Sequence, residues 1–381
     1  MSRILASTLV VVLVAATAAA DVRALKAGDV PTYVELDKGE RITFQLHDGT
    51  VHAIGLVDYT RTSAELTING VKQAVRYRPQ DLPREIVGMR VGVEITQAWN
   101  DRMRFKWFAL TKACRLFLSD ASRPVMSNPE GVYPLSPPAR IAGGTIWGGG
   151  WLANRREAQK DCHIGFDVYG PLGTRLLAIE DVVVTAVWVD KDYDRMIVVD
   201  LAGKRFHYRC LHLMKALVTK GQKLKRGDVV GLIGQSGYAI YPHLHLHMML
   251  PGPAAAETKD TGRDREYFRL RSPGVNVNPG PYIHDMYKRI DPKTLVDSHT
   301  VRLSAVDAEG NPVKWPHWRV KAPDGTLYDI GIRSKTSVRR GVNPFTFIAE
   351  RRKFSLRGET TATVTKNRQP VTVIMQKTPA R

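Results

Sequence analysis

The sequence has few cysteines, few acidic residues and, after its first twenty residues, no long apolar run. Cys114, Cys162 and Cys210 are the only cysteines among 381 residues, and no pair has the C-x-x-C spacing of a zinc site. No later segment has the roughly 18 consecutive apolar residues that a membrane-spanning helix needs. Low-complexity tracts and long internal repeats are missing as well. What remains is the composition of a soluble globular protein, with 43% hydrophobic and 24% charged residues.

The N-terminal segment has the layout of a cleavable secretory signal. Arg3 supplies a positive start, residues 9–14 form an apolar run, and three alanines follow before Asp21. The apolar run is too short for a membrane anchor and lacks a charged stop-transfer flank. We therefore expect residues 1–20 to be removed as a signal peptide. The mature protein would be periplasmic, secreted or surface-associated, with no transmembrane segment.

Basic residues outnumber acidic ones by 56 to 37, which gives a formal net charge of +19. An exported protein rarely meets nucleic acid, so we expect no nucleic-acid partner. An anionic polymer of the cell envelope is the expected counterpart, either the cell wall, teichoic acid or lipopolysaccharide. Small basic clusters occur at Arg339-Arg340 and at residues 351–353. A solvated basic surface without a dedicated binding patch is the alternative interpretation.

The chain length predicts two or three domains, mainly of β structure. Residues 21–120 contain several short runs of alternating apolar and polar residues, and Asn69-Gly70 predicts a hairpin turn between two of them. His47 lies in a turn and His52 in a strand of this region, and both are interpreted as solvated, with a role as ligands as the alternative. We expect an N-terminal β-rich domain without a catalytic constellation.

The rest of the chain divides into a central and a C-terminal region. Residues 121–162 are rich in proline and glycine and are predicted as a linker and irregular segment. Residues 163–250 hold short apolar strands without helix-length gaps, which predicts a mostly antiparallel sheet. The proline-rich stretch 251–290 is predicted as a long loop, so the central domain would span 121–297. Residues 298–381 indicate a small β-sandwich, Ig-like or similar to a carboxypeptidase regulatory domain.

One short segment in the central region separates polar from apolar side chains. Alternate residues of a strand share a face, so His163, Gly165 and Asp167 would lie on one side. Gly165 would leave open space between the two polar side chains. The intervening apolar residues would face a core on the other side: Ile164, Phe166 and Val168.

A second segment, from Pro242 to Met248, follows the same pattern. His243, His245 and His247 would share one face, with leucines and a methionine on the other. Laid side by side, the two strands would offer two histidines and an aspartate, a set that suits zinc and leaves the fourth position open for water. Zinc lowers the pKa of such a water towards roughly 7, which provides a nucleophile at neutral pH.

The order of these motifs resembles that of the LytM/lysostaphin-type metalloendopeptidases. H-x-x-x-D comes first, then a strand ending in H-L before paired glycine turns, then G-x-S-G and P-H-L-H. The matching residues are His163–Asp167, His212-Leu213, Gly221, Gly227, Gly231, Gly234–Gly237 and Pro242–His245. Each motif is weak alone, but their order and spacing over about residues 130–295 are highly specific. The resemblance implies the duplicated hybrid motif fold, a compact antiparallel β structure with the site in an open groove.

The resemblance also implies a role for each matching residue. His163, Asp167 and His245 would bind zinc, with one ion per chain. His212 and His243 would be the two non-ligand catalytic histidines, which orient or deprotonate the water, stabilise the oxyanion and protonate the leaving amine.

The sequence departs from the family pattern in three places. Leu246 and His247 stand where the family usually has an aromatic and an acidic residue. His247 shares the predicted ligand face and is interpreted as a packed or solvated histidine. The alternatives are that it hydrogen-bonds to a metal ligand or is itself an additional metal ligand. Tyr238 and Tyr241 replace a loop of small residues and are candidate substrate-binding residues. The insertion 251–289 has no counterpart in the family.

An exported protein meets oxidising conditions, which permit one disulfide among the three cysteines. Cys162 directly precedes His163, and Cys210 lies two residues before His212. Because both cysteines lie beside candidate site residues, Cys162–Cys210 is the favoured pair.

The ligand set, the signal and the positive charge together favour an exported zinc metalloendopeptidase that cuts peptide cross-links or stem peptides of peptidoglycan. A zinc endopeptidase acting on secreted proteins is one alternative. A non-catalytic regulator of other wall hydrolases is another, although the intact His163, Asp167 and His245 argue against it. A binding module built on the two flanking domains is the third.

Overall fold

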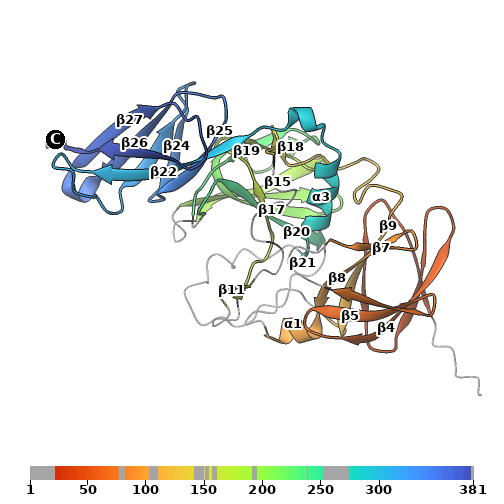
Figure 1. Cartoon of the computed structure of the whole chain (residues 1–381). Coiled ribbons are helices and arrows are strands. Elements are labelled where there is room, and N and C mark those ends of the chain that lie inside the picture. Colours follow the sequence, from red (N-terminus) through yellow and green to blue (C-terminus); the bar gives the residue numbers. More distant parts are fainter. Residues whose placement is uncertain are drawn as a thin grey trace, which may run out of the picture.

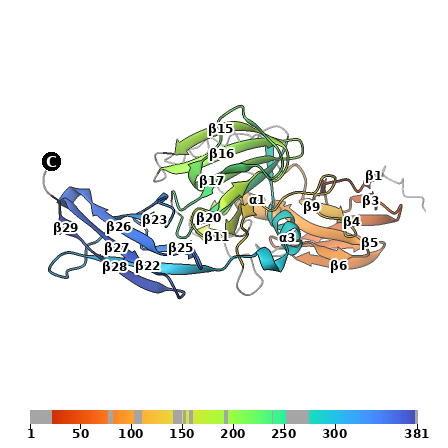
Figure 2. The same cartoon turned by 90° about the horizontal axis from the view of Figure 1, so that it is seen from above.

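The computed structural model describes residues 22–76, 82–102, 110–140, 150, 154–156, 161–190, 195–237, 239–251 and 274–378. The described part is mainly β structure, as predicted, and forms three units that follow one another in space as they do in the sequence (Figures 1 and 2). The predicted signal peptide, 1–20, lies outside the described residues. Among the described residues, no helix is both long and apolar enough to cross a bilayer.

The N-terminal unit consists of two sheets packed around one core. Their strand orders are β1-β3-β4-β5-β6 and β2-β9-β8-β7. Asn69 and Gly70 have φ angles of 50° and 81° between β5 and β6, which is the two-residue hairpin turn that the sequence predicts. The elements are β1 (Arg23–Lys26), β2 (Thr32–Leu36), β3 (Arg41–Gln45), β4 (Val51–Tyr59), β5 (Ser63–Ile68), β6 (Val71–Arg76), β7 (Arg84–Ile86), β8 (Met89–Thr96), α1 (Gln97–Arg102) and β9 (Cys114–Asp120).

The two histidines of this unit have partners in the protein. His52 is buried, and its Nδ1 lies 3.0 Å from the side-chain nitrogen of Asn69. His47 lies 3.0 Å from the carboxylate of Asp120. The expectation of a solvated side chain was therefore wrong for His52, which the alternation of β4 turns towards the core, whereas His47 is exposed.

The middle unit is built on an antiparallel sheet of ten strands, which confirms the predicted strand direction. The main path runs β10-β14-β19-β17-β16-β15-β18, and β20 pairs with β13, β17 and β21. A separate pair, β11–β12, lies apart from this sheet. The strands are β10 (Leu135–Ser136), β11 (Asn154–Arg156), β12 (Asp161–Cys162), β13 (Phe166–Tyr169), β14 (Arg175–Leu177), β15 (Val182–Asp190), β16 (Met196–Gly203), β17 (His207–Ala216), β18 (Lys223–Leu224), β19 (Val229–Ile233), β20 (His243–Pro251) and β21 (Gly274–Val277).

Two segments predicted as irregular contribute to this unit. Part of 121–162 forms β10 at the edge of the sheet, and Leu135 is buried in the core. In 251–290, β21 pairs with β20 and is followed by helix α3 (Gly280–Lys288), and the short η3 (Pro292–Thr294) comes just after this segment. Pro281 does not prevent the helix because it lies in the first turn, where a backbone N–H has no helical partner. The remainder of the predicted loop, 252–273, lies outside the described residues.

The C-terminal unit is a sandwich of two sheets. A three-stranded sheet, β25-β22-β28, packs against a five-stranded sheet, β24-β23-β26-β27-β29, over a core that contains Trp318 and Phe347. The elements are β22 (Ser298–Val306), β23 (His317–Lys321), β24 (Leu327–Gly331), β25 (Lys335–Arg339), β26 (Phe345–Arg351), η4 (Arg352–Phe354), β27 (Leu356–Ala362), β28 (Gln369–Ile374) and β29 (Gln376–Lys377).

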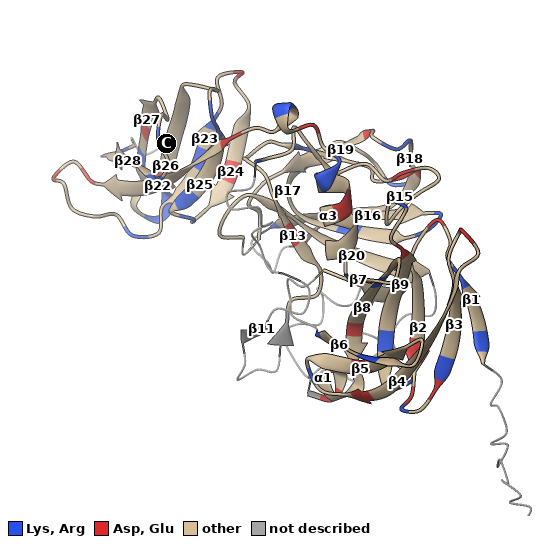
Figure 3. Cartoon of the chain, turned by 45° about the vertical axis from the view of Figure 1, so that its right-hand side comes forward, with Lys and Arg blue, Asp and Glu red and all other residues tan. Residues whose placement is uncertain are grey.

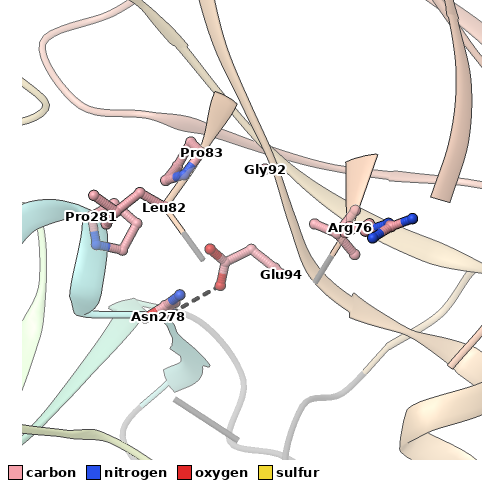
Figure 4. A pocket seen from close by; sticks show the side chains of 8 residues that line it. Arg76, Leu82, Pro83, Gly92, Glu94, Asn278 and Pro281 are labelled. Atoms are coloured by element: carbon pink, nitrogen blue, oxygen red, sulfur yellow. Dashed lines mark hydrogen bonds between the residues drawn. The ribbon is translucent and has the colours of Figure 1, made fainter. Parts of the chain in front are cut away.

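Buried side chains join the N-terminal unit to the middle unit. Phe117 of β9 belongs to the core of the middle unit, beside Tyr282 of α3. The hydroxyls of Tyr33 and Tyr282 are 2.7 Å apart. Glu94 of β8 accepts a hydrogen bond of 2.9 Å from the backbone N–H of Asn278, just ahead of α3 (Figure 4). The two units therefore share one continuous interior rather than a loose linker.

Cys210 carries a free thiol, so the predicted disulfide with Cys162 is not formed. Its side chain points from β17 into the core, and burial raises the pKa of the thiol far above its ordinary value. Cys114 is a second free and buried cysteine. Nearness in the sequence to the site histidines misled the prediction. Cys210 lies opposite Leu246 of β20 on the core face, and the positive φ of His212 takes the backbone out of the regular alternation that would have put both side chains on one face.

Candidate metal centre

Strand β20 lies at the centre of the site and has the predicted alternation. Leu244, Leu246 and Met248 are fully buried in the core of the middle unit. His243, His245 and His247 occupy the opposite face, where they too are less than one-tenth exposed. Because β20 pairs with β13 on one side and β17 on the other, its histidines are flanked by side chains from both strands.

The segment that carries His163 and Asp167 differs from the prediction of one regular strand. Strand β13 begins at Phe166, and Gly165 has a φ of 118°, so the alternation is interrupted between His163 and Asp167. Ile164 consequently packs into the core of the N-terminal unit, while Phe166 packs into the core of the middle unit. Asp167 lies directly opposite His245 in the β13–β20 register. The predicted common core behind these residues was wrong, although the two polar side chains do meet.

Gly165 allows this break because the backbone there is packed against two histidines. A Cβ at this position would lie 2.8 Å from His245 Nε2 and 2.8 Å from His247 Cδ2. The φ of 118° is also one that residues with side chains rarely adopt. The glycine therefore permits a close approach, and the open space that the sequence predicts at this point is filled by imidazole rings.

His163, Asp167 and His245 converge on one point. His245 Nδ1 lies 2.8 Å from His163 Nε2 and 2.7 Å from Asp167 Oδ1, and His163 Nε2 lies 3.1 Å from the same carboxylate oxygen. The exposed fractions of the three residues are 2%, 6% and 4%. The structure thus brings together the three residues that the sequence predicts as metal ligands.

The hydrogen bonds around this cluster suit a bound cation. His163 donates from Nδ1 to the carbonyl of Gly150 at 3.0 Å, so in its neutral form the lone pair is on Nε2, which faces the cluster. His245 Nε2 lies 2.8 Å from His247 Nε2, which offers an acceptor for the His245 proton, so that Nδ1 can turn its lone pair to a cation in the cluster. The atoms of tetrahedral zinc ligands lie about 3.4 Å apart when each is about 2.1 Å from the ion. Small outward shifts of the three side chains would therefore accommodate zinc.

Asp167 remains ionised in this environment. Burial by itself would raise the pKa of the carboxyl group. The charges of His243 and His163, with hydrogen bonds from His163 and His245, outweigh burial and hold the pKa of Asp167 well below its ordinary value. An anionic carboxylate between imidazoles is a strong ligand for a divalent cation.

His212 and His243 lie beside the cluster with a common arrangement. His212 donates from Nδ1 to the carbonyl of Ser236, and His243 donates from Nδ1 to the carbonyl of Tyr241, both at 2.7 Å. Their ring centroids are 4.7 Å apart, and His243 Nε2 lies 3.5 Å from Asp167 Oδ1. Burial, together with the neighbouring His243 and His245, lowers the pKa of His212 well below its ordinary value. A proton held on Nδ1 in this way leaves Nε2 of each ring as the atom that can accept a proton.

The structure corrects the predicted position of His212 in its strand. Strand β17 continues to Ala216 rather than ending at His212. His212 has a φ of 63°, and the pairing of β17 with β19 shifts register between Leu213 and Lys215. A left-handed residue that is not glycine is strained, and such residues are frequent at functional sites. The irregularity turns the imidazole towards His243.

The remaining predicted site residues differ in what they contribute. Tyr241 is partly buried, and its carbonyl accepts the hydrogen bond from His243. Tyr238 lies outside the described residues. His247 is packed against His245, and burial, with His245 and Arg209 nearby, lowers its pKa well below the ordinary value. The carbonyls of Gly150 and Ser236 were not predicted, and only the G-x-S-G motif could have drawn attention to Ser236.

Residues 161–257 match peptidase family M23. The chain contains a peptidase M23 domain. The matched range includes every residue of the cluster and both further histidines, and it confirms the resemblance to LytM and lysostaphin.

Curated relatives match over the same region. The chain is 39% identical over 90 residues to "Peptidoglycan DD-endopeptidase ShyA" of Vibrio cholerae, a match that covers 24% of this chain and 21% of the relative. It is 34% identical over 118 residues to "Glycyl-glycine endopeptidase ALE-1" of Staphylococcus capitis, covering 30% of this chain and 31% of that protein. The chain thus spans less than a third of the length of each of these relatives.

Among solved structures, the catalytic domain of lysostaphin from Staphylococcus simulans aligns with 41% of this chain and 93% of that chain. The sequence identity is 20%, and the TM-score is 0.24.

Proposed function

We propose that this chain is an exported zinc-dependent endopeptidase that hydrolyses peptide bonds in the cross-links or stem peptides of peptidoglycan. The observation that carries the proposal is the buried His163–Asp167–His245 cluster inside an M23 domain. Relatives over this domain are named as peptidoglycan and glycyl-glycine endopeptidases, which supports the substrate class. The export signal expected at residues 1–20 agrees with a substrate outside the cytoplasm.

The chain's own residues supply binding and proton transfer. His163 Nε2, Asp167 Oδ1 and His245 Nδ1 would hold one zinc ion, whose Lewis acidity would bring the pKa of a water towards roughly 7. His212 and His243, each held through Nδ1, are placed to accept the proton of the attacking water at Nε2. The same proton can then pass to the amine that leaves. Either imidazole, once protonated, can also stabilise negative charge on the carbonyl oxygen.

The expected partner is the anionic envelope polymer, and the C-terminal sandwich offers a surface for it. We define the aromatic–basic patch as Trp315, Arg351, Lys353 and Phe354. Trp315 is 63% exposed and Phe354 is 55% exposed. The Arg351 guanidinium donates to the Trp315 carbonyl at 2.8 Å and lies 5.5 Å from the Phe354 ring centroid. Aromatic faces suit sugar rings and the cations suit carboxylates, whereas most other Lys and Arg are spread over the molecule (Figure 3).

The test is release of new amino termini from purified peptidoglycan, with secreted proteins as parallel substrates. We expect release by the parent protein, none after chelation, and none by His163→Ala, while both proteins still sediment with peptidoglycan. If the protein cleaves secreted proteins but not peptidoglycan, its substrate is a secreted protein and not the cell wall. A protein that binds peptidoglycan and stimulates other hydrolases without cleaving any bond itself would be a regulator, and the proposal would be wrong.

A further inference from the structure

The loop between β19 and β20 sets the orientation of both non-ligand histidines. Its Ser236 carbonyl accepts the hydrogen bond from His212, and its Tyr241 carbonyl accepts the one from His243. Each carbonyl holds the proton on Nδ1 and leaves Nε2 to act in proton transfer. A displacement of this loop would therefore change the orientation of both imidazole rings at once.

The middle unit itself anchors the first part of this loop. The Ser236 hydroxyl donates to the Leu213 carbonyl at 2.7 Å and accepts from the Ile197 N–H at 3.1 Å. These bonds fix Ser236 between β16 and β17, next to His212.

The C-terminal sandwich anchors the part of the loop that follows. Arg333, in the turn between β24 and β25, donates from Nε to the Ala239 carbonyl at 3.0 Å and from Nη2 to the Gly237 carbonyl at 2.9 Å. The sandwich also holds the residue ahead of Ser236, because Gln235, which is 1% exposed, donates to the Lys335 carbonyl at 2.8 Å. A planar guanidinium fixes two acceptors in both distance and direction, which a lysine cannot do.

The contact between sandwich and middle unit is a packed one. Leu172 of the middle unit belongs to the core of the sandwich, and its N–H donates to the Ser337 carbonyl at 2.9 Å. A rigid neighbour is required if Arg333 is to hold the loop in place, and this shared core provides it.

We propose that Arg333 is a positioning residue of the catalytic centre, through which the C-terminal sandwich holds the β19–β20 loop and thereby orients His212 and His243. The inference rests on the proposed peptidase function and adds that the sandwich is part of the active enzyme. The left-handed backbone of His212 is strained, so its conformation depends on such external restraint.

Arg333→Ala in the full chain tests this, with Arg302→Ala, an exposed arginine on β22 of the same sandwich, as the matched control. On soluble cross-linked muropeptides we expect kcat of Arg333→Ala to fall about 10- to 100-fold while KM changes less than about threefold. Zinc content and melting temperature should stay at the parent values. Arg333→Lys should remain impaired, and added guanidinium ion should restore part of the activity of Arg333→Ala alone.

Hydrogen exchange gives a readout that does not depend on activity. Peptides covering 233–242 should exchange faster in Arg333→Ala than in the parent or Arg302→Ala, with the strands of the sheet unchanged. Unchanged kcat and unchanged exchange would overturn the inference, as would loss of zinc or of the folded sandwich. A parent protein that cleaves nothing would refute the proposed function, and faster loop exchange in the variant would then still establish the anchoring role.

Discussion

At the scale of single residues, the site depends on backbone groups that aim imidazole rings. Gly150, Ser236 and Tyr241 each present a carbonyl to the Nδ1 of a different histidine. Every one of these histidines therefore keeps Nε2 for a metal ion or a proton. His245 has the opposite arrangement, because its Nε2 faces His247 and its Nδ1 faces the cluster.

Gly165 is the residue at which this packing leaves no room for a side chain. We expect Gly165→Ala to lower the free energy of unfolding by about 2–4 kcal/mol and to weaken zinc binding, because a Cβ would meet two histidines. Gly221→Ala is the matched control, since Gly221 has a φ of 87° and a Cβ there would meet nothing within 4 Å, so the change should cost about 1–2 kcal/mol. Chemical denaturation and zinc competition measure both effects. Equal losses in the two variants would contradict the packing argument.

At the scale of elements, the sequence predicts correctly those features that follow from regular strand alternation or from turn chemistry. The histidine face of β20 follows from the period of a strand, and the hairpin at Asn69-Gly70 follows from turn chemistry. The predictions fail where the backbone of a single residue departs from regular strand geometry. Gly165 interrupts the strand ahead of β13, and His212 interrupts β17 with a positive φ. Such breaks are imposed by contacts with neighbouring strands, and no local pattern in the sequence encodes them.

The junction of β8 with α3 contains a second testable element, the buried Glu94. Burial raises the pKa of Glu94 to about 7, although the Asn278 N–H and the charge of Arg115 act in the opposite direction. The folded protein therefore binds this proton more tightly than the unfolded chain. The stabilisation is fully present below the unfolded pKa of roughly 4.3 and is lost as pH rises through about 7.

Glu94→Gln removes this titration while keeping an acceptor for Asn278. Between pH 5 and pH 8 we expect the free energy of unfolding of the parent to fall, relative to Glu94→Gln, by about 2–3 kcal/mol. Urea denaturation of the two proteins at both pH values measures the difference. The same pH dependence in both proteins would show that Glu94 does not titrate at this junction.

At the scale of the whole molecule, the three units are joined by residues that no local pattern links. Ile164, next to a predicted metal ligand, packs into the N-terminal unit, and Arg333 of the sandwich reaches the loop that holds two histidines. The ligand set could be predicted because its motifs are short and ordered. These contacts could not, because they depend on how separately folded units dock.

The aromatic–basic patch allows a prediction about the sandwich. Trp315→Ala combined with Phe354→Ala should lower the affinity for sedimenting peptidoglycan about 10-fold, because both stacking rings are lost and Arg351 and Lys353 lose the Phe354 ring that they contact. Activity on soluble muropeptides should be unchanged. Tyr59→Ala is the matched control, because Tyr59 lies 5.1 Å from Lys38 Nζ in the N-terminal unit. Equal loss of binding in the control would show that the patch has no dedicated role.

The central claim is that His163, Asp167 and His245 form a zinc site, and elemental analysis of the purified protein tests it most directly. The account predicts about one zinc per chain in the parent and almost none in His245→Ala, with peptidoglycan cleavage lost in parallel. Asp58→Ala, which removes an exposed carboxylate of the N-terminal unit, should retain both metal and activity. Absence of zinc from the parent protein, or an unchanged zinc content in His245→Ala, would contradict the account.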